Sequence, residues 1–109
     1  MMGAMRISLM AASFLVATAA QGADLNAGQA KAKEICQACH GIDGNSAVPD
    51  YPKLGGQYPD YLAKALRDYK SGARKNPIMA GFAGALTAQD IENLAAYYAS
   101  QPPVLARKY

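Results

Sequence analysis

Apolar and polar residues recur with a helical period in three stretches of the chain. The first, "LNAGQAKAKEICQAC" (residues 25–39), is dominated by Ala, Lys, Glu and Gln, which favour helix. Asp24 or Asn26 can cap its start, and Gly41 is expected to end it. Runs of alternating β-branched residues are absent from the sequence, so we predict an all-α fold.

The second stretch, "YPDYLAKALRDYKSG" (residues 58–72), carries an apolar stripe with the spacing of one helix face. Pro59 suits the first helical turn, and Gly72 suits the C-terminal end. The stripe consists of Tyr58, Leu62, Leu66 and Tyr69.

The third stretch, "LTAQDIENLAAYYASQPP" (residues 86–103), has the clearest helical signals. Thr87 followed by Asp90 resembles a capping box, with Asp in place of the usual Glu or Gln. Two successive prolines at 102–103 stop the helix. Its apolar face consists of Ile91, Leu94, Ala95 and Tyr98.

Two segments rich in Gly and Pro separate these helices and are predicted to be loops. They are "GIDGNSAVPDYPKLGGQ" (residues 41–57) and "ARKNPIMAGFAGA" (residues 73–85). In the second, Pro77 disfavours helix at Asn76, and the glycines weaken the helical tendency of the rest.

The N-terminal residues 1–23 have the layout of a secretory signal peptide. Arg6 precedes an uncharged apolar run over 7–20, and small residues follow it. A run of this length is shorter than the ~20 residues that span a bilayer, although a retained membrane anchor is the alternative interpretation. We predict cleavage between residues 19 and 24 and a single domain over 24–109.

Charge and size narrow the class of protein. The formal net charge is +3 and falls to +2 without the leader, because Arg6 is the one charged residue lost. This balance is too mild for a nucleic-acid-binding protein. A body of this size buries little surface and often needs a disulfide, a metal or a cofactor to hold it together.

The stretch "CQACHG" (residues 36–41) contains both cysteines and the only histidine of the chain. On a helical turn, Cys36 and Cys39 face the same way, and His40 projects from the same turn. Two thiols at this spacing can add to the vinyl groups of a haem while the imidazole ligates the iron. The spacing C-x-x-C-H is typical of c-type haem attachment.

Three other interpretations of this stretch compete with haem attachment. A thioredoxin-like C-x-x-C requires a βαβ setting, which the sequence does not predict. A structural zinc site needs four protein ligands, and this motif offers three within five residues. A disulfide that closes so short a span would constrain the unfolded chain little and would leave the histidine unexplained.

Met79 is the candidate for the second axial ligand of the iron. It is the one methionine outside the predicted leader, and no second histidine exists. A loop around it can lay the thioether on the face opposite His40, although a methionine that merely fills a gap in the core is the alternative. A thioether ligand raises the reduction potential, and two protein ligands leave no open iron site. Electron transfer is therefore favoured over catalysis.

The chain resembles class I cytochromes c, and particularly the small bacterial periplasmic monohaem type. The resemblance rests on "GQAKAKEICQACHG", "VPDYPKLGGQ" and "YLAKALRDYKSGARKNPIMAGFAGALTAQDIENLAAYYASQ", which together cover nearly all of residues 24–109. It implies one covalently bound haem c, with His40 proximal and Met79 distal. It also implies three main helices with loops wrapped around the haem.

The resemblance implies further roles for single residues. Gly28 matches the small residue at which the first and last helices cross, with Leu94 and Tyr97 packed against it. Ala32 stands where the wider family often has an aromatic residue. Pro49 matches the proline whose backbone carbonyl accepts the N–H of the ligating imidazole and so orients the ring.

We therefore predict a periplasmic, monomeric electron carrier, not an enzyme, that serves respiratory complexes, oxidases or dehydrogenases. We expect neither nucleic-acid binding nor stable membrane insertion after cleavage. The alternatives are the cytochrome subunit of a larger oxidoreductase, or a haem peroxidase or sensor in which Met79 is displaceable.

Charged and polar residues in and next to the second predicted helix suggest two further contacts. Propionate binding is open to Arg67, Gln57 and Tyr58, among which the sequence does not choose. A basic surface could steer acidic redox partners, or could be a solvated helix face. It would consist of Lys64, Arg67, Lys70, Arg74 and Lys75.

Overall fold

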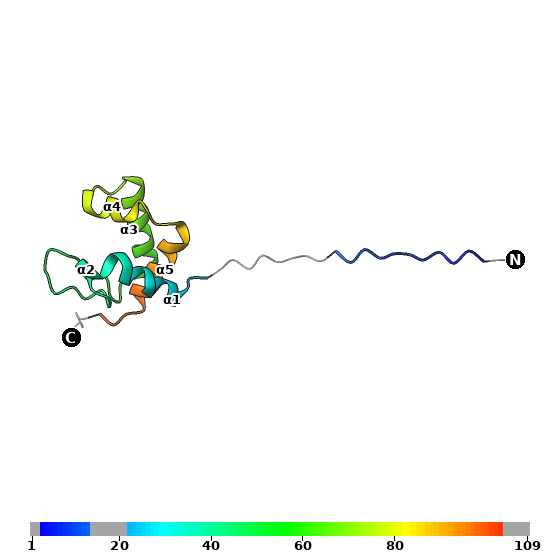
Figure 1. Ribbon diagram of the computed structural model, residues 1–109, viewed down its shortest axis with the longest axis horizontal. Helices are drawn as coiled ribbons and strands as arrows, with labels where there is room; N and C mark the ends of the chain where they lie inside the picture. The colour runs from blue at the N-terminus through cyan, green and yellow to red at the C-terminus, as the bar shows by residue number, and fades with distance from the viewer. Residues whose placement is uncertain (1–2, 14–21, 104–109) are drawn as a thin grey trace.

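The structure, a computed structural model, describes residues 3–13 and 22–103 of the chain. Within these residues every regular element is a helix, which confirms the predicted all-α fold (Figure 1). The elements are α1 (Leu25–Lys31), η1 (Ala32–Cys36), α2 (Gln37–His40), α3 (Pro59–Ser71), α4 (Pro77–Ala83) and α5 (Ala88–Ala99).

The first predicted helix corresponds to three consecutive elements, α1, η1 and α2. Asp24 is the N-cap, since its side chain accepts hydrogen bonds from the backbone N–H groups of Asn26 and Ala27. The middle element, η1, is a short π-helical segment, in which the N–H of Gln37 bonds the carbonyl of Ala32. The helix ends at Gly41, whose φ of 80° is costly for any other residue.

The second and third predicted helices are present as α3 and α5. Pro59 opens α3, and Gly72 ends it in the left-handed conformation, with φ of 85°. At the start of α5 the predicted capping box forms: Thr87 Oγ1 accepts from the N–H of Asp90, and the Asp90 carboxylate accepts from the N–H of Thr87.

The prediction that residues 73–85 form a loop is wrong, because α4 lies within them. Asn76 is extended and caps α4, since its side-chain oxygen accepts from the N–H groups of Ile78 and Met79. Pro77 keeps Asn76 out of the helix but occupies the first helical position, where its missing N–H has no cost. The proline that was read as a helix breaker therefore starts a helix.

Helices α1 and α5 cross in direct backbone contact, with α3 packed on α5 and α4 packed on α3 (Figure 1). A Cβ atom on Gly28 would lie 2.2 Å from the carbonyl oxygen of Asn93 and 2.8 Å from the Cβ of Tyr97. The predicted role of Gly28 at this crossing is thus confirmed. Ala32 is fully buried beside it, so a small side chain fills the position that is often aromatic in the wider family.

The predicted signal peptide falls partly outside the described residues, because 14–21 belong to the part that the structure does not describe. Residues 3–13 carry no regular secondary structure and are exposed. Among the described residues, no helix has the length and apolar character needed to cross a membrane.

Candidate functional site

The described residues enclose a mainly apolar cavity of about 310 Å³ between α2, α3, α4, α5 and the segment 50–57. Cys36, Cys39 and His40 line it from the end of the first helical segment, and Met79 lines it from α4. The four residues singled out as haem ligands and attachment points therefore share one cavity. Pro49, the fifth, does not line it.

Cys36 and Cys39 are free thiols, each partly buried. Burial raises the pKa of the Cys36 thiol to about 11, although a hydrogen bond with Tyr98 and the charge of Lys31 oppose that rise. Both sulfurs are one helical turn apart on the cavity wall, so a flat ligand in the cavity can be reached by both.

The imidazole of His40 is held in one tautomer by the loop that follows it. The ring is 8% exposed, and its Nδ1 lies 2.8 Å from the carbonyl oxygen of Pro52. Because a carbonyl oxygen can only accept, Nδ1 carries the proton and donates it to this bond. The lone pair of Nε2 is then available for a metal.

The carbonyl that accepts the hydrogen bond from His40 was predicted to be that of Pro49, and this prediction is wrong: it is the carbonyl of Pro52, three residues later. Both prolines lie in the same Gly- and Pro-rich loop, so the composition of the loop could not distinguish them. The turn between them is tied by the Ser46 hydroxyl, which donates to the carbonyls of Val48 and Tyr51. This turn presents the next carbonyl, that of Pro52, to the histidine.

Met79 is placed by the first turn of α4. Two of that turn's N–H groups, including its own, are bound by the Asn76 side chain, so the position of the residue is fixed by a local cap. Met79 is half-buried and lines the cavity together with its helical neighbours Ile78 and Phe82, which are more exposed. Helix α4 thus contributes Met79 to the cavity wall.

Two tyrosines of α5, which sequence reasoning assigned only to packing, tie the attachment motif to the last helix. The Tyr97 hydroxyl donates to the carbonyl of Ile42 at 2.6 Å, and the Tyr98 hydroxyl donates to that of Gly41 at 3.1 Å. Burial raises the pKa of both phenols, so they remain donors at neutral pH. The chain is therefore held immediately after His40.

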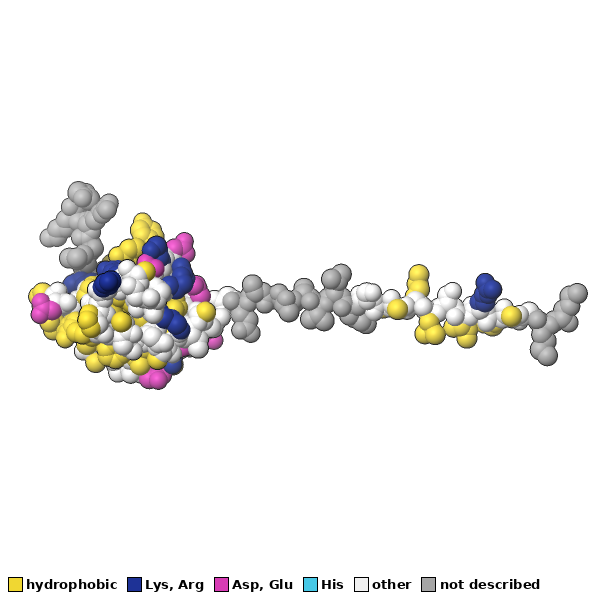
Figure 2. All heavy atoms as spheres, turned by 90° about the horizontal axis from the view of Figure 1, so that it is seen from above, with side chains coloured by type: hydrophobic (Ala, Val, Ile, Leu, Met, Phe, Trp, Pro, Cys, Tyr) yellow, Lys and Arg dark blue, Asp and Glu magenta, His cyan; other side chains and the backbone are white. Residues whose placement is uncertain are grey.

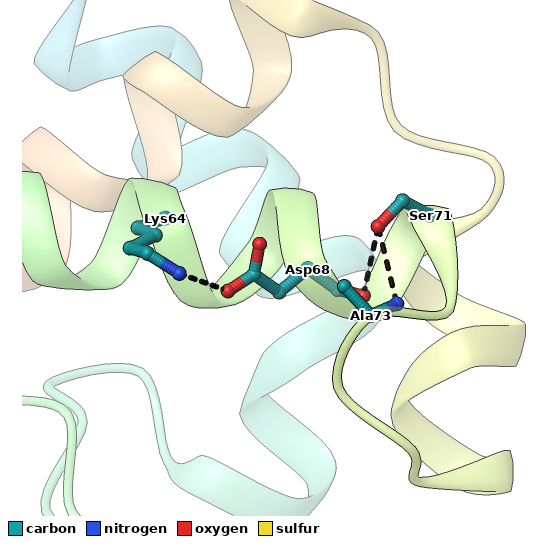
Figure 3. Close-up of polar contacts among 4 residues, drawn as sticks. All are labelled: Lys64, Asp68, Ser71 and Ala73. Atoms are coloured by element: carbon teal, nitrogen blue, oxygen red, sulfur yellow. Dashed lines mark hydrogen bonds and ion pairs between the residues drawn. The ribbon is translucent and has the colours of Figure 1, made fainter.

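Of the five residues of the suggested basic surface, the three that lie on α3 each have a partner, whereas Arg74 and Lys75 follow the helix and are exposed. Lys64 pairs with Asp68, Arg67 pairs with Glu92 of α5 at 3.1 Å, and Lys70 donates to the carbonyl of Leu86 (Figure 3 shows the first pair). On the face seen in Figure 2, basic and acidic side chains are interspersed with hydrophobic ones.

The donor set and the cavity fit a c-type haem. The cavity wall is mainly apolar, as a porphyrin requires, and it presents two thiols, one imidazole nitrogen and one thioether. No group of three or more His, Cys, Asp or Glu side chains that could hold a metal ion occurs among the described residues. The four side chains at the cavity are suited to an iron held in a macrocycle.

Comparison with known proteins gives the same result. Residues 25–101 match the sequence profile described as cytochrome c. Cytochrome c4 of Thiocapsa roseopersicina is 52% identical over 86 residues, which cover 79% of this chain and 44% of that protein. The crystal structure of reduced recombinant cytochrome c4 from Pseudomonas stutzeri superposes with a TM-score of 0.69 at 44% identity, over 74% of this chain and 47% of the other.

This chain spans about half the length of those cytochromes c4, whereas a shorter relative is matched over nearly the whole of its own length. Cytochrome c-554(548) of Halomonas halodenitrificans is 43% identical over 82 residues, which cover 69% of this chain and 99% of that protein. A protein of Thiomonas intermedia named thiosulfate dehydrogenase electron acceptor is 42% identical over 62% of this chain and 32% of its own length.

Proposed function

The chain belongs to the cytochrome c family, and on that premise we propose that it carries single electrons through one covalently bound haem c. The observation that supports this most directly is the shared cavity of Cys36, Cys39, His40 and Met79. The proposal of one haem is supported by the cysteine and histidine content of this sequence, since every such residue lies within one motif.

Cys36 and Cys39 would hold the macrocycle through thioether bonds, and His40 and Met79 would hold the iron. When bound, the haem supplies one-electron chemistry, with the iron alternating between the ferric and ferrous states. The Pro52 carbonyl keeps the proton on Nδ1, which orients the His40 ring and increases the basicity of Nε2. The weakly donating thioether of Met79 favours the ferrous state and so raises the potential.

Two axial side chains would leave no iron position for oxygen, peroxide or another substrate. Electron carriage therefore suits this site better than peroxidase or sensor activity, either of which would require Met79 to leave the iron. We accordingly propose that the chain exchanges electrons with other redox proteins, such as respiratory complexes, oxidases or dehydrogenases.

A role as the cytochrome component of a larger oxidoreductase is the second candidate. It is favoured by the relative named thiosulfate dehydrogenase electron acceptor and by the double length of the matching cytochromes c4. The relative whose whole length matches this chain favours a single-domain carrier instead. Purification of the protein from its host distinguishes the two, because a subunit co-elutes with a catalytic partner.

We also propose that residues 1–23 direct export to the periplasm, where haem c would be attached. The charged start and apolar run of this segment support the proposal. The N-terminal sequence of the purified holoprotein tests it: a new terminus between residues 19 and 24 is expected, and an intact leader would contradict it.

The proposed function is tested by visible spectra of the purified protein, oxidised and reduced, with and without carbon monoxide. We expect a haem spectrum that carbon monoxide does not change in the reduced state. We also expect the haem to stay attached to the chain during denaturing electrophoresis. A colourless protein would refute the cofactor. Carbon monoxide binding at neutral pH would refute saturated ligation and favour a sensor or peroxidase.

A further inference from the structure

Two cationic side chains, Lys53 and Arg74, stand in the wall of the cavity. The ion pairs found among the described residues engage other cations, namely Lys31, Lys64 and Arg67, so neither wall cation has a carboxylate within 4 Å in that part of the chain. Both residues are exposed to solvent, and Asp50 lines the same wall, so each cation is available to a negatively charged group that a ligand brings to the cavity.

Arg74 is held in place by its surroundings before any ligand binds. Its guanidinium carbon lies 4.8 Å from the centre of the Tyr69 ring, and Tyr69 also lines the cavity. Stacking on an aromatic ring uses the face of the guanidinium, so its N–H groups, which lie in the plane, remain free to donate.

The backbone that carries Arg74 is fixed by the end of α3. The N–H of Arg74 donates to the carbonyl of Asp68 at 3.0 Å. The Ser71 hydroxyl donates to the same carbonyl and accepts from the N–H of Ala73, which closes the turn (Figure 3). Arg74 thus lies in a turn after α3 that is closed by three hydrogen bonds, so its backbone is fixed in position.

We propose that Arg74, stacked on Tyr69, binds a propionate carboxylate of the haem. The proposal rests on the proposed haem binding and adds the residue that binds the negatively charged propionate side of the haem. A guanidinium can donate two parallel hydrogen bonds to one carboxylate, which a lysine ammonium does not match in geometry.

The structure also separates the three propionate candidates named from the sequence. Arg67 pairs with Glu92 and does not line the cavity, and Tyr58 is 79% exposed and outside the wall. Gln57 lines the cavity, and because its side-chain oxygen accepts from the N–H of Tyr58, its amide N–H groups remain available; it carries, however, no charge to match that of a carboxylate. Among the described residues, no aromatic ring is stacked beneath Lys53 as Tyr69 is beneath Arg74.

The test uses the haem-loaded protein and four substitutions: Arg74→Gln, its charge-preserving partner Arg74→Lys, the control Arg67→Gln, and Lys53→Gln at the other wall cation. Resonance Raman spectroscopy measures the propionate bending vibration, and redox titration measures the potential. In Arg74→Gln we expect covalent haem to be retained, the bending band to shift and the potential to fall. The potential falls because a positive charge beside the haem favours the ferrous state.

In Arg74→Lys we expect the potential to be restored in part while the band stays shifted, because the charge remains without the planar fork. Arg67→Gln should match the wild type in both measurements. The proposal would be overturned if Arg74→Gln had the same propionate band and the same potential as Arg67→Gln. It would also be overturned if the propionate band shifted in Lys53→Gln and did not shift in Arg74→Gln. Those results would leave haem binding intact, whereas a wild-type protein without haem would refute both proposals.

Discussion

The crossing of α1 and α5 makes a quantitative prediction about Gly28. In Gly28→Ala the new methyl group would lie 2.2 Å from a backbone oxygen of Asn93, whereas an ordinary carbon–oxygen contact is about 3.3 Å. The two backbones must therefore separate by about 1 Å, because the carbonyl cannot rotate away as a side chain would. Overpacking of this kind costs about 1–3 kcal/mol.

A gain in helix propensity partly offsets that cost. Replacement of glycine by alanine within a helix favours folding by about 1 kcal/mol. Because the clash is with backbone atoms, the upper part of the overpacking range applies, about 2–3 kcal/mol. After subtraction of the propensity gain, we expect Gly28→Ala to lower the free energy of unfolding by about 1–2 kcal/mol, which lowers the urea midpoint by roughly 0.5–1.5 M. The measurement is urea denaturation of the haem-loaded protein, followed by far-ultraviolet circular dichroism.

Gly81→Ala is the matched control, because Gly81 is also helical and a Cβ there would have no neighbour within 4 Å. The same substitution should raise the urea midpoint at this position, since only the propensity term acts. If Gly28→Ala were as stable as the wild type, the explanation that the close approach of α1 and α5 requires a glycine at position 28 would be refuted.

Three further predictions concern the site and the last helix. Met79→Ala should keep covalent haem, lower the reduction potential and allow carbon monoxide to bind, and an unchanged potential would remove Met79 from the iron. The double change of Cys36 and Cys39 to alanine should yield a chain that carries no haem through denaturing electrophoresis; haem that remained attached would contradict the thioether assignment. The pKa of Asp90 is lowered chiefly by the hydrogen bond from the N–H of Thr87. The stability that the ionised carboxylate contributes is therefore fully present above the ordinary pKa of an aspartate, and it is lost as pH falls through the lowered pKa. Asp90→Asn should therefore reduce stability at neutral pH and less in acid, as measured by urea midpoints across pH, and an equal loss at every pH would refute this.

Much of the local structure could be predicted from the sequence because its causes lie within a few residues. The capping box of α5 needs only Thr87 and Asp90, three residues apart. The C-x-x-C-H stretch brings its three side chains to one turn through helical spacing alone. In both cases the interacting groups are neighbours in the chain, so the path of the rest of the molecule does not matter.

The helix α4 shows where local signals conflict. Pro77 disfavours helix before it and favours a helix that starts at it, and both effects operate here. The glycines nearby weakened the case for a helix, whereas the Asn76 cap and the packing of α4 on α3 stabilise it. Met79 was singled out from the sequence as a candidate ligand and lies at the cavity, but its position on a capped helix followed from packing that the sequence pattern does not express.

By itself, the sequence determined the helical stretches that contain α1, α3 and α5, the C-x-x-C-H motif, and the choice of Met79 as its candidate partner. Tertiary structure alone decided that the carbonyl of Pro52, and not that of Pro49, accepts the hydrogen bond from His40. The path of the loop between them depends on contacts between residues that are not adjacent in the chain, such as the hydrogen bond from the N–H of Gly55 to the carbonyl of Gly44. It also decided that Arg74 faces the cavity while Arg67 pairs with α5. The physical reason is that hydrogen bonds within one turn are encoded by spacing, whereas the partners of a loop or a long side chain depend on which surfaces the packed helices bring together.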